Sequence, residues 1–200
     1  MIRPRSPLVF LWLALAAAVA GCSAVNPPMQ RLPEITFTNL PPFQLDVARI
    51  EVVSQYEPPA QAPHIEYDMP ESPEKALRRW TQDRLKAVGR SGILRVAIRN
   101  AAATETPLKT EQGFSSMFEK QQAARLDMSI DVALQMLDER QFVVSEVTGR
   151  AEISHTETEG MKLNDRDKLL YDMVHDMLTG FDGEMDSKIL STFGRWLGAR

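Results

Sequence analysis

Alternation of apolar and polar residues predicts a β-sheet in the middle and the C-terminal half of this chain. Every second residue is apolar from Leu126 to Met136, which is the clearest period-two pattern in the sequence. Shorter alternations over 94–99 and 142–155 predict two more strands, and the turn at 138–141 joins the last two into a long antiparallel hairpin. Val143 and Val147 are expected on its core face, opposite a wet face. A β-rich run over 47–53 predicts the first strand.

A first helix is predicted between the first and second strands. Ser72 is a suitable N-cap, and Pro73 suits the first helical position. Trp80 and Val88 are among the apolar residues on one stripe, so Trp80 is expected to be a core residue rather than a ligand-stacking one. Gly89 is expected to end the helix as its C′ residue.

A long second helix is predicted at the C-terminal end, with Asn164 as its N-cap. Gly180 and Gly183 interrupt it, and each costs about 1 kcal/mol relative to alanine, so a kink or break is expected there. Methionines at helical spacing usually fill a core. The apolar stripe consists of Leu170, Met173, Val174, Met177, Phe181, Met185, Ile189, Phe193 and Trp196.

The predicted element order is β-α-β-β-β-α. This order favours an α+β, two-layer sandwich in which a four-stranded, largely antiparallel sheet is covered by two helices. Between the first strand and the first helix lies the proline-rich segment Tyr56–Met69. We interpret it either as an extended recognition surface or as a rigid strap over the sheet.

Residues 1–21 have the composition of a secretory signal. Arg3 and Arg5 precede an apolar run from Leu8 to Ala20, which is shorter than the roughly 20 residues that a spanning helix needs. Removing this segment leaves 179 residues with 21 basic and 27 acidic side chains, a formal charge of −6. A mildly acidic domain without a block of Lys and Arg is a poor candidate for nucleic-acid binding.

The run from Val19 to Cys22 resembles the lipobox of bacterial lipoproteins, and Cys22 is the only cysteine. The resemblance implies that Cys22 is acylated, with palmitate among its acyl chains, and becomes the first residue of the mature protein. Two or more chains give stable anchoring. In the sorting rule of enteric lipoproteins, an Asp after the cysteine retains the protein in the inner membrane. Ser23 at this position therefore favours the outer membrane, with the domain facing the periplasm. The domains expected are a signal peptide at 1–21, the acylated Cys22 with a proline-rich tether at 22–44, and one folded domain at 45–200.

Motifs for catalysis, metal or cofactor binding are weak in this sequence. Asp172, His175 and Asp176 are neighbours on the second helix, but a solvated polar face explains them better than a metal site. Ser91 lies in a glycine turn without the spacing of a nucleophile elbow. We therefore expect no enzymatic activity, no metal and no cofactor.

One loop contains three large apolar side chains in polar surroundings. Phe114, Met117 and Phe118 lie between the second and third predicted strands, close to Gly113. They are interpreted as a contact for a partner or a membrane, or else as side chains that fold back over the edge of the core.

The middle of the chain resembles a group of uncharacterised lipoproteins from Gram-negative bacteria. The element order is also similar to that of auxiliary lipoproteins of ABC-type lipid transporters and of the lipopolysaccharide-assembly lipoprotein, a likeness of fold that transfers no site. The resemblance to the uncharacterised group rests on Ala62-Pro63, Glu66, Pro70, Pro73, Ala76, Trp80, Asp83-Arg84-Leu85, Gly89, Gly92, Glu105 and Pro107-Leu108.

These observations favour a non-enzymatic, lipid-anchored envelope protein. The expected role is that of an accessory subunit in an envelope assembly or lipid-transport complex. The alternative is a periplasmic lipoprotein that binds a lipid or small ligand on its own, which requires an enclosed apolar cavity.

Overall fold

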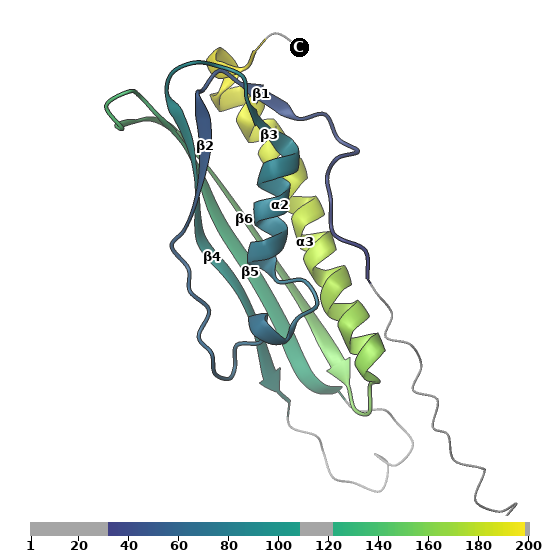
Figure 1. Ribbon diagram of the computed structural model, residues 1–200. Helices are drawn as coiled ribbons and strands as arrows, with labels where there is room; N and C mark the ends of the chain where they lie inside the picture. The colour runs from purple at the N-terminus through teal and green to yellow at the C-terminus, as the bar shows by residue number, and fades with distance from the viewer. Residues whose placement is uncertain (1–31, 109–121, 199–200) are drawn as a thin grey trace, which may run out of the picture. The chain divides into compact units, whose positions relative to one another are not determined.

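The computed structural model describes residues 32–108 and 122–198. Its elements follow the order β1 (Phe43–Leu45), β2 (Arg49–Ser54), η1 (Glu66–Asp68), α2 (Pro73–Arg84), β3 (Leu85–Ala87), β4 (Ile93–Pro107), β5 (Gln122–Leu137), β6 (Val143–Thr158), α3 (Leu163–Thr192) and η3 (Gly194–Trp196). The expected α+β two-layer architecture is confirmed: a four-stranded sheet carries α2 and α3 on one face (Figure 1).

The main sheet has the strand order β2-β4-β5-β6. β4 pairs with β5, and β5 with β6, in antiparallel register, whereas β2 pairs with β4 in parallel. The chain returns between the parallel strands β2 and β4 through α2, as a parallel connection requires a crossover. A second, two-stranded parallel sheet joins β1 to β3 and was not predicted.

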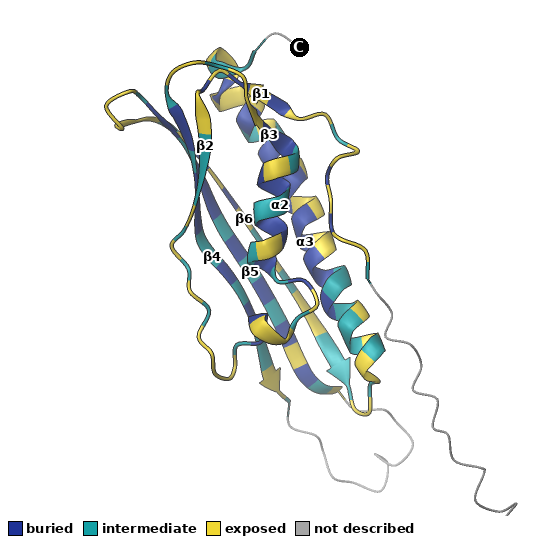
Figure 2. Ribbon diagram, in the orientation of Figure 1, coloured by how far each residue is buried: buried dark blue, intermediate teal, exposed yellow. Residues whose placement is uncertain are grey.

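The two faces of the main sheet differ as the alternation predicted. On the face below the helices, Val96, Leu134 and Val147 are buried side by side in one row. Figure 2 shows buried and less buried residues alternating along the strands of this sheet. The outer face carries exposed charge pairs between strands, such as Arg150 with Asp131 at 2.7 Å. The period of two therefore separates a core face from a wet face.

The first helix ends earlier than predicted. Ser72 caps it by accepting a hydrogen bond from the backbone N–H of Lys75, but α2 stops at Arg84, and the next three residues form β3 beside β1. The stripe was therefore wrong at its end, because strand pairing replaced the last helical turn, and Val88 is 54% exposed. Gly89 is not a C′ residue, because it follows β3 rather than the helix. A Cβ at Gly89 would lie 2.2 Å from Asp46 Oδ1, so the close approach of these two segments requires glycine.

The second helix is continuous where a break was expected. α3 runs through Gly180 and Gly183, both of which are exposed. Phe181 and Met185, between and beside these glycines, are fully buried, so their packing outweighs the low helix propensity of glycine. The start also differs, because Lys162 rather than Asn164 occupies the N-cap position and forms no side-chain cap.

The folded domain begins before the expected boundary at residue 45. Ile35 and Phe37 are buried, although their segment has no regular secondary structure. The N–H of Phe37 donates to Asp83 on α2 at 2.8 Å, and Glu34 pairs with Arg79 at 3.1 Å. The last part of the expected tether thus lies along α2.

Candidate binding sites

The residues predicted as sites lie outside the described part of the chain. Cys22 precedes it, and Phe114, Met117 and Phe118 belong to the connection between β4 and β5. Three other features of the described residues are candidate binding sites. They are an anchored strap, a buried ionic cluster with an adjoining pocket, and an apolar hairpin tip.

The proline-rich segment Tyr56–Met69 contains a strap on the sheet. β2 ends beside Ile98, so the edge of β4 beyond that point has no partner strand. The strap covers it: the N–H of Ile65 donates to Ala103 O at 3.0 Å, and the N–H of Glu105 donates to Pro63 O at 2.8 Å. Of the two interpretations, this part of the segment fits the strap, which blunts an open edge.

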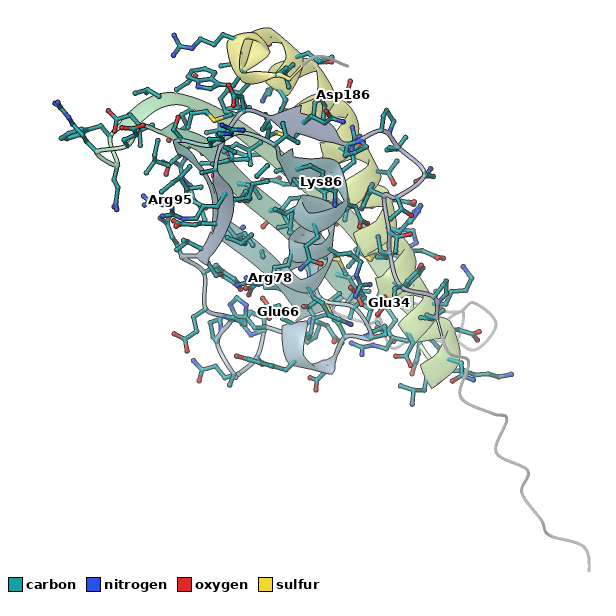
Figure 3. The ribbon with its side chains drawn as sticks, turned by 45° about the horizontal axis from the view of Figure 1, so that its top comes forward. Glu34, Glu66, Arg78, Lys86, Arg95 and Asp186 are labelled. Atoms are coloured by element: carbon teal, nitrogen blue, oxygen red, sulfur yellow. The ribbon has the colours of Figure 1, made fainter. Side chains whose placement is uncertain are left out.

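A buried carboxylate fastens this strap. Glu66 Oε1 accepts hydrogen bonds from the Tyr56 hydroxyl at 2.5 Å and from the N–H of Ala103 at 2.9 Å (Figure 3). His64 Nδ1 lies 3.1 Å from the same oxygen. Burial alone raises the pKa of Glu66, but these hydrogen bonds outweigh it and hold the pKa below its ordinary value. Burial and the nearby carboxylate raise the pKa of Tyr56, so its hydroxyl stays a donor.

Glu66→Gln is expected to destabilise the domain by about 2 kcal/mol at neutral pH, because it removes a buried carboxylate that accepts charge-assisted hydrogen bonds. Because the pKa of Glu66 is lower in the folded state than in the unfolded state, ionised Glu66 stabilises the folded domain at pH values above the unfolded-state pKa of about 4.3. This stabilisation is lost as the pH falls through the folded-state pKa. The difference in melting temperature between the two proteins should therefore shrink below about pH 4.3. Glu139→Gln, at an exposed turn, is the control. If the difference in melting temperature between Glu66→Gln and the unmodified protein stays constant down to about pH 3, roughly one unit below the ordinary pKa of glutamate, Glu66 is not the stabilising carboxylate described here.

A buried ionic cluster links α2 to α3. Arg84, whose side chain is 2% exposed, donates through Nε to Asp182 at 2.6 Å and through Nη2 to Asp186 at 2.9 Å. Its Nη1 also donates to Pro41 O. The indole N–H of Trp80 donates to the same Asp182 oxygen at 2.7 Å. One arginine therefore holds both helices and the N-terminal segment.

The cluster was missed in the sequence, although a signal exists. Trp80 and Arg84 are four residues apart on one helix, as are Asp182 and Asp186 on the other. Residues at this spacing share a face. Asp182 also interrupts the apolar stripe between Phe181 and Met185, and a charge inside such a stripe requires a buried partner.

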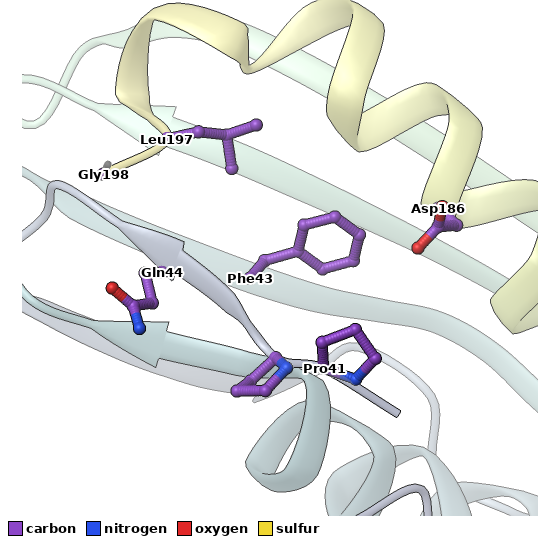
Figure 4. Close-up of a pocket in the computed structure, with 7 residues that line it drawn as sticks. Pro41, Phe43, Gln44, Asp186, Leu197 and Gly198 are labelled. Atoms are coloured by element: carbon purple, nitrogen blue, oxygen red, sulfur yellow. The ribbon is translucent and has the colours of Figure 1, made fainter. Parts of the chain in front are cut away.

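A pocket of about 320 Å³ adjoins the cluster. Its walls come from the segment around β1, from α3 and from the chain beyond η3, and Figure 4 shows the Asp186 carboxylate pointing toward the ring of Phe43. Phe43 also lies under the Arg84 guanidinium, 4.8 Å from the ring centroid. The pocket is thus largely apolar and carries one acidic group. Its lining residues are Pro41, Pro42, Phe43, Gln44, Asp186, Leu197 and Gly198.

The β5–β6 hairpin carries an apolar tip at its turn. Phe142 is 67% exposed, and Val143 and Val144 are each nearly half exposed. The prediction that Val143 faces the core was wrong. The register of β6 shifts between Val143 and Ser145, and this irregularity, typical of a β-bulge, places Val143, on the turn side of the bulge, out of the alternation.

In the described part of the chain, the histidines belong to no metal site and the methionines of α3 belong to the core. Within residues 32–108 and 122–198, no group of three His, Cys, Asp or Glu side chains lies close enough to hold a metal ion. His175 is exposed, and its ring Nδ1 lies 3.2 Å from the carboxylate of the neighbouring Asp176. Met173, Met177 and Met185 are buried in the core, as their spacing predicted. Among the described helices, none has both the length and the apolar character of a membrane span.

No family model matches the sequence, and no curated protein matches it either. Among solved structures, the chain is similar to the solution structure of uncharacterized lipoprotein B from Nitrosomonas europaea, at 19% identity over 68% of this chain and 81% of that one. The TM-score is 0.32.

Proposed function

We propose that the protein is a non-enzymatic lipoprotein of the bacterial envelope that binds another envelope protein as an accessory subunit, for example of an assembly or lipid-transport complex. Acyl chains on Cys22 anchor it in the outer membrane, and its domain faces the periplasm. The anchor is supported by the order of Arg3, Arg5, the apolar run and the lipobox.

The observation that carries the binding role is the exposed apolar tip of Phe142, Val143 and Val144. Three consecutive large apolar side chains at a turn cost solvation free energy unless a partner covers them. The loop with Phe114, Met117 and Phe118 is a second proposed contact, for a partner or a membrane.

The partner of the tip is proposed to be a protein. The tip projects from the sheet at the end where β4 begins, beyond the paired parts of β5 and β6 (Figure 1).

Cys22→Ala tests the anchor. The variant is expected to lose labelling by radioactive palmitate and to leave the membrane fraction or remain unprocessed, because no other cysteine is present to carry an acyl chain. Ser23→Ala is the matched control and should stay labelled and membrane-bound. Palmitate on the Cys22→Ala protein would refute the anchor.

The pocket beside Phe43 supports a second candidate function, that of a periplasmic ligand-binding lipoprotein. Its volume of about 320 Å³ lies at the lower end of the range for small-molecule sites. Such a site would admit a fragment-sized ligand rather than a whole lipid.

A further inference from the structure

We propose that the pocket beside Phe43 and Asp186 binds a small organic cation, with a planar amidinium or guanidinium group on an apolar body. This inference does not depend on the anchor or on the hairpin tip. It rests on the charge of the buried cluster, on the direction of Asp186 and on the composition of the pocket walls.

The buried cluster carries an excess negative charge. Arg84 supplies one positive charge, whereas Asp182 and Asp186 supply two negative charges. Arg84 and Asp182 are almost fully buried, but the Asp186 side chain is 46% exposed. The excess charge therefore faces the pocket at Asp186. The ammonium group of Lys86, on β3, donates to Gln82 O rather than to Asp186.

The geometry of Asp186 leaves room for a second donor. Arg84 Nη2 donates to Oδ1, and the carboxylate points into the pocket toward Phe43 (Figure 4). A carboxylate can accept more than one charge-assisted hydrogen bond, and a planar amidinium presents two parallel N–H groups that match it. On the buried side of the cluster, Arg84 makes one hydrogen bond to each of two carboxylates, from Nε to Asp182 and from Nη2 to Asp186.

The walls select an apolar body behind the cation. Pro41, Pro42 and Leu197 offer hydrocarbon surface around the ring of Phe43. Such walls exclude water, which strengthens the interaction between the ligand cation and Asp186. An aromatic ring attached to an amidinium satisfies both requirements, so benzamidine is a suitable probe.

The test compares two probes of nearly equal shape and different charge. Para-fluorobenzamidine and the neutral para-fluorobenzamide are titrated against the full chain in a non-ionic detergent, and binding is followed by fluorine NMR. We expect the amidine to bind with a Kd in the low-millimolar range, as its few atoms allow. The amide should bind at least about tenfold more weakly. Equal binding of the two probes, or no binding of the amidine, would overturn the proposal.

Two variants locate the site. Asp186→Asn is expected to weaken amidine binding about tenfold, and Asp176→Asn, an exposed position on the same helix, should leave it unchanged. Gly198→Leu should block the pocket without touching the ion pairs, because a Cβ there meets its nearest atom at 3.5 Å and is tolerated. Thermal melts confirm that each variant is folded. Unchanged amidine binding in folded Gly198→Leu would place the cation elsewhere and reject this pocket.

Discussion

Asp182→Ala should be among the most damaging single substitutions in the domain, with a loss of about 3–5 kcal/mol in the free energy of unfolding. The variant leaves the buried Arg84 guanidinium without its 2.6 Å partner and the Trp80 indole N–H without an acceptor. Removing one member of a buried ion pair costs more than the pair contributes, since the remaining charge stays desolvated. For a domain of this size, the melting temperature should fall by about 10 °C or more.

Two further variants separate this explanation from a general effect of mutating α3. Asp176→Ala, at an exposed position on the same helix, should change stability by no more than about 0.5 kcal/mol. The double change Arg84→Met with Asp182→Leu should recover part of the loss, because no buried charge is then left without a partner, although the Trp80 indole N–H still lacks its acceptor. A melting temperature of Asp182→Ala equal to that of the unmodified protein would show that the ion pair does not form.

Trp80→Ala should cost a similar amount, about 3–5 kcal/mol, for a different reason. The Trp80 side chain is fully buried and packs edge-on against Phe181, with ring centroids 5.0 Å apart. Truncation removes this apolar contact, leaves a cavity between α2 and α3, and takes one donor from Asp182.

Denaturant unfolding followed by circular dichroism measures this loss without depending on tryptophan fluorescence. Trp80→Phe should have an intermediate effect, since it keeps an apolar ring but removes the indole donor. Tyr67→Ala, at a ring that is 67% exposed, is the control and should be close to neutral. If Trp80→Ala unfolds at the same denaturant concentration as the unmodified protein, the ring is not the core residue described above.

The middle strands were predictable because their alternation is a local property. In β5, every second residue from Leu126 to Met136 is buried, as the period of two predicts. The N-cap at Ser72 was predictable for the same reason, since a cap needs only the next helical turn. By contrast, no local pattern indicated that Leu85–Ala87 would leave the helix to pair with β1, some forty residues earlier in the chain.

The candidate site depended more on contacts between distant segments. Glu66 lies in a segment with two interpretations, and only its contacts and those of its neighbours with β4 identified part of that segment as a strap. The pocket joins residues near position 42 to Asp186 and Gly198, whose proximity no spacing in the sequence reveals. The apolar tip follows from a shift of register near Val143, which depends on the partner strand as well as on β6 itself.

The sequence by itself determined the order of the four main-sheet strands and the two long helices, the core face of the long strands, the buried role of Trp80 and the lipobox that motivates the anchor. These features rest on periodicity, capping and short motifs, each of which acts over a few neighbouring residues. Only the tertiary structure decided where α2 stops, why α3 continues through two glycines, and how Arg84 meets Asp182 and Asp186. The physical reason is that packing and burial of charge depend on segments about a hundred residues apart, and their free energies exceed the local preferences that a sequence displays.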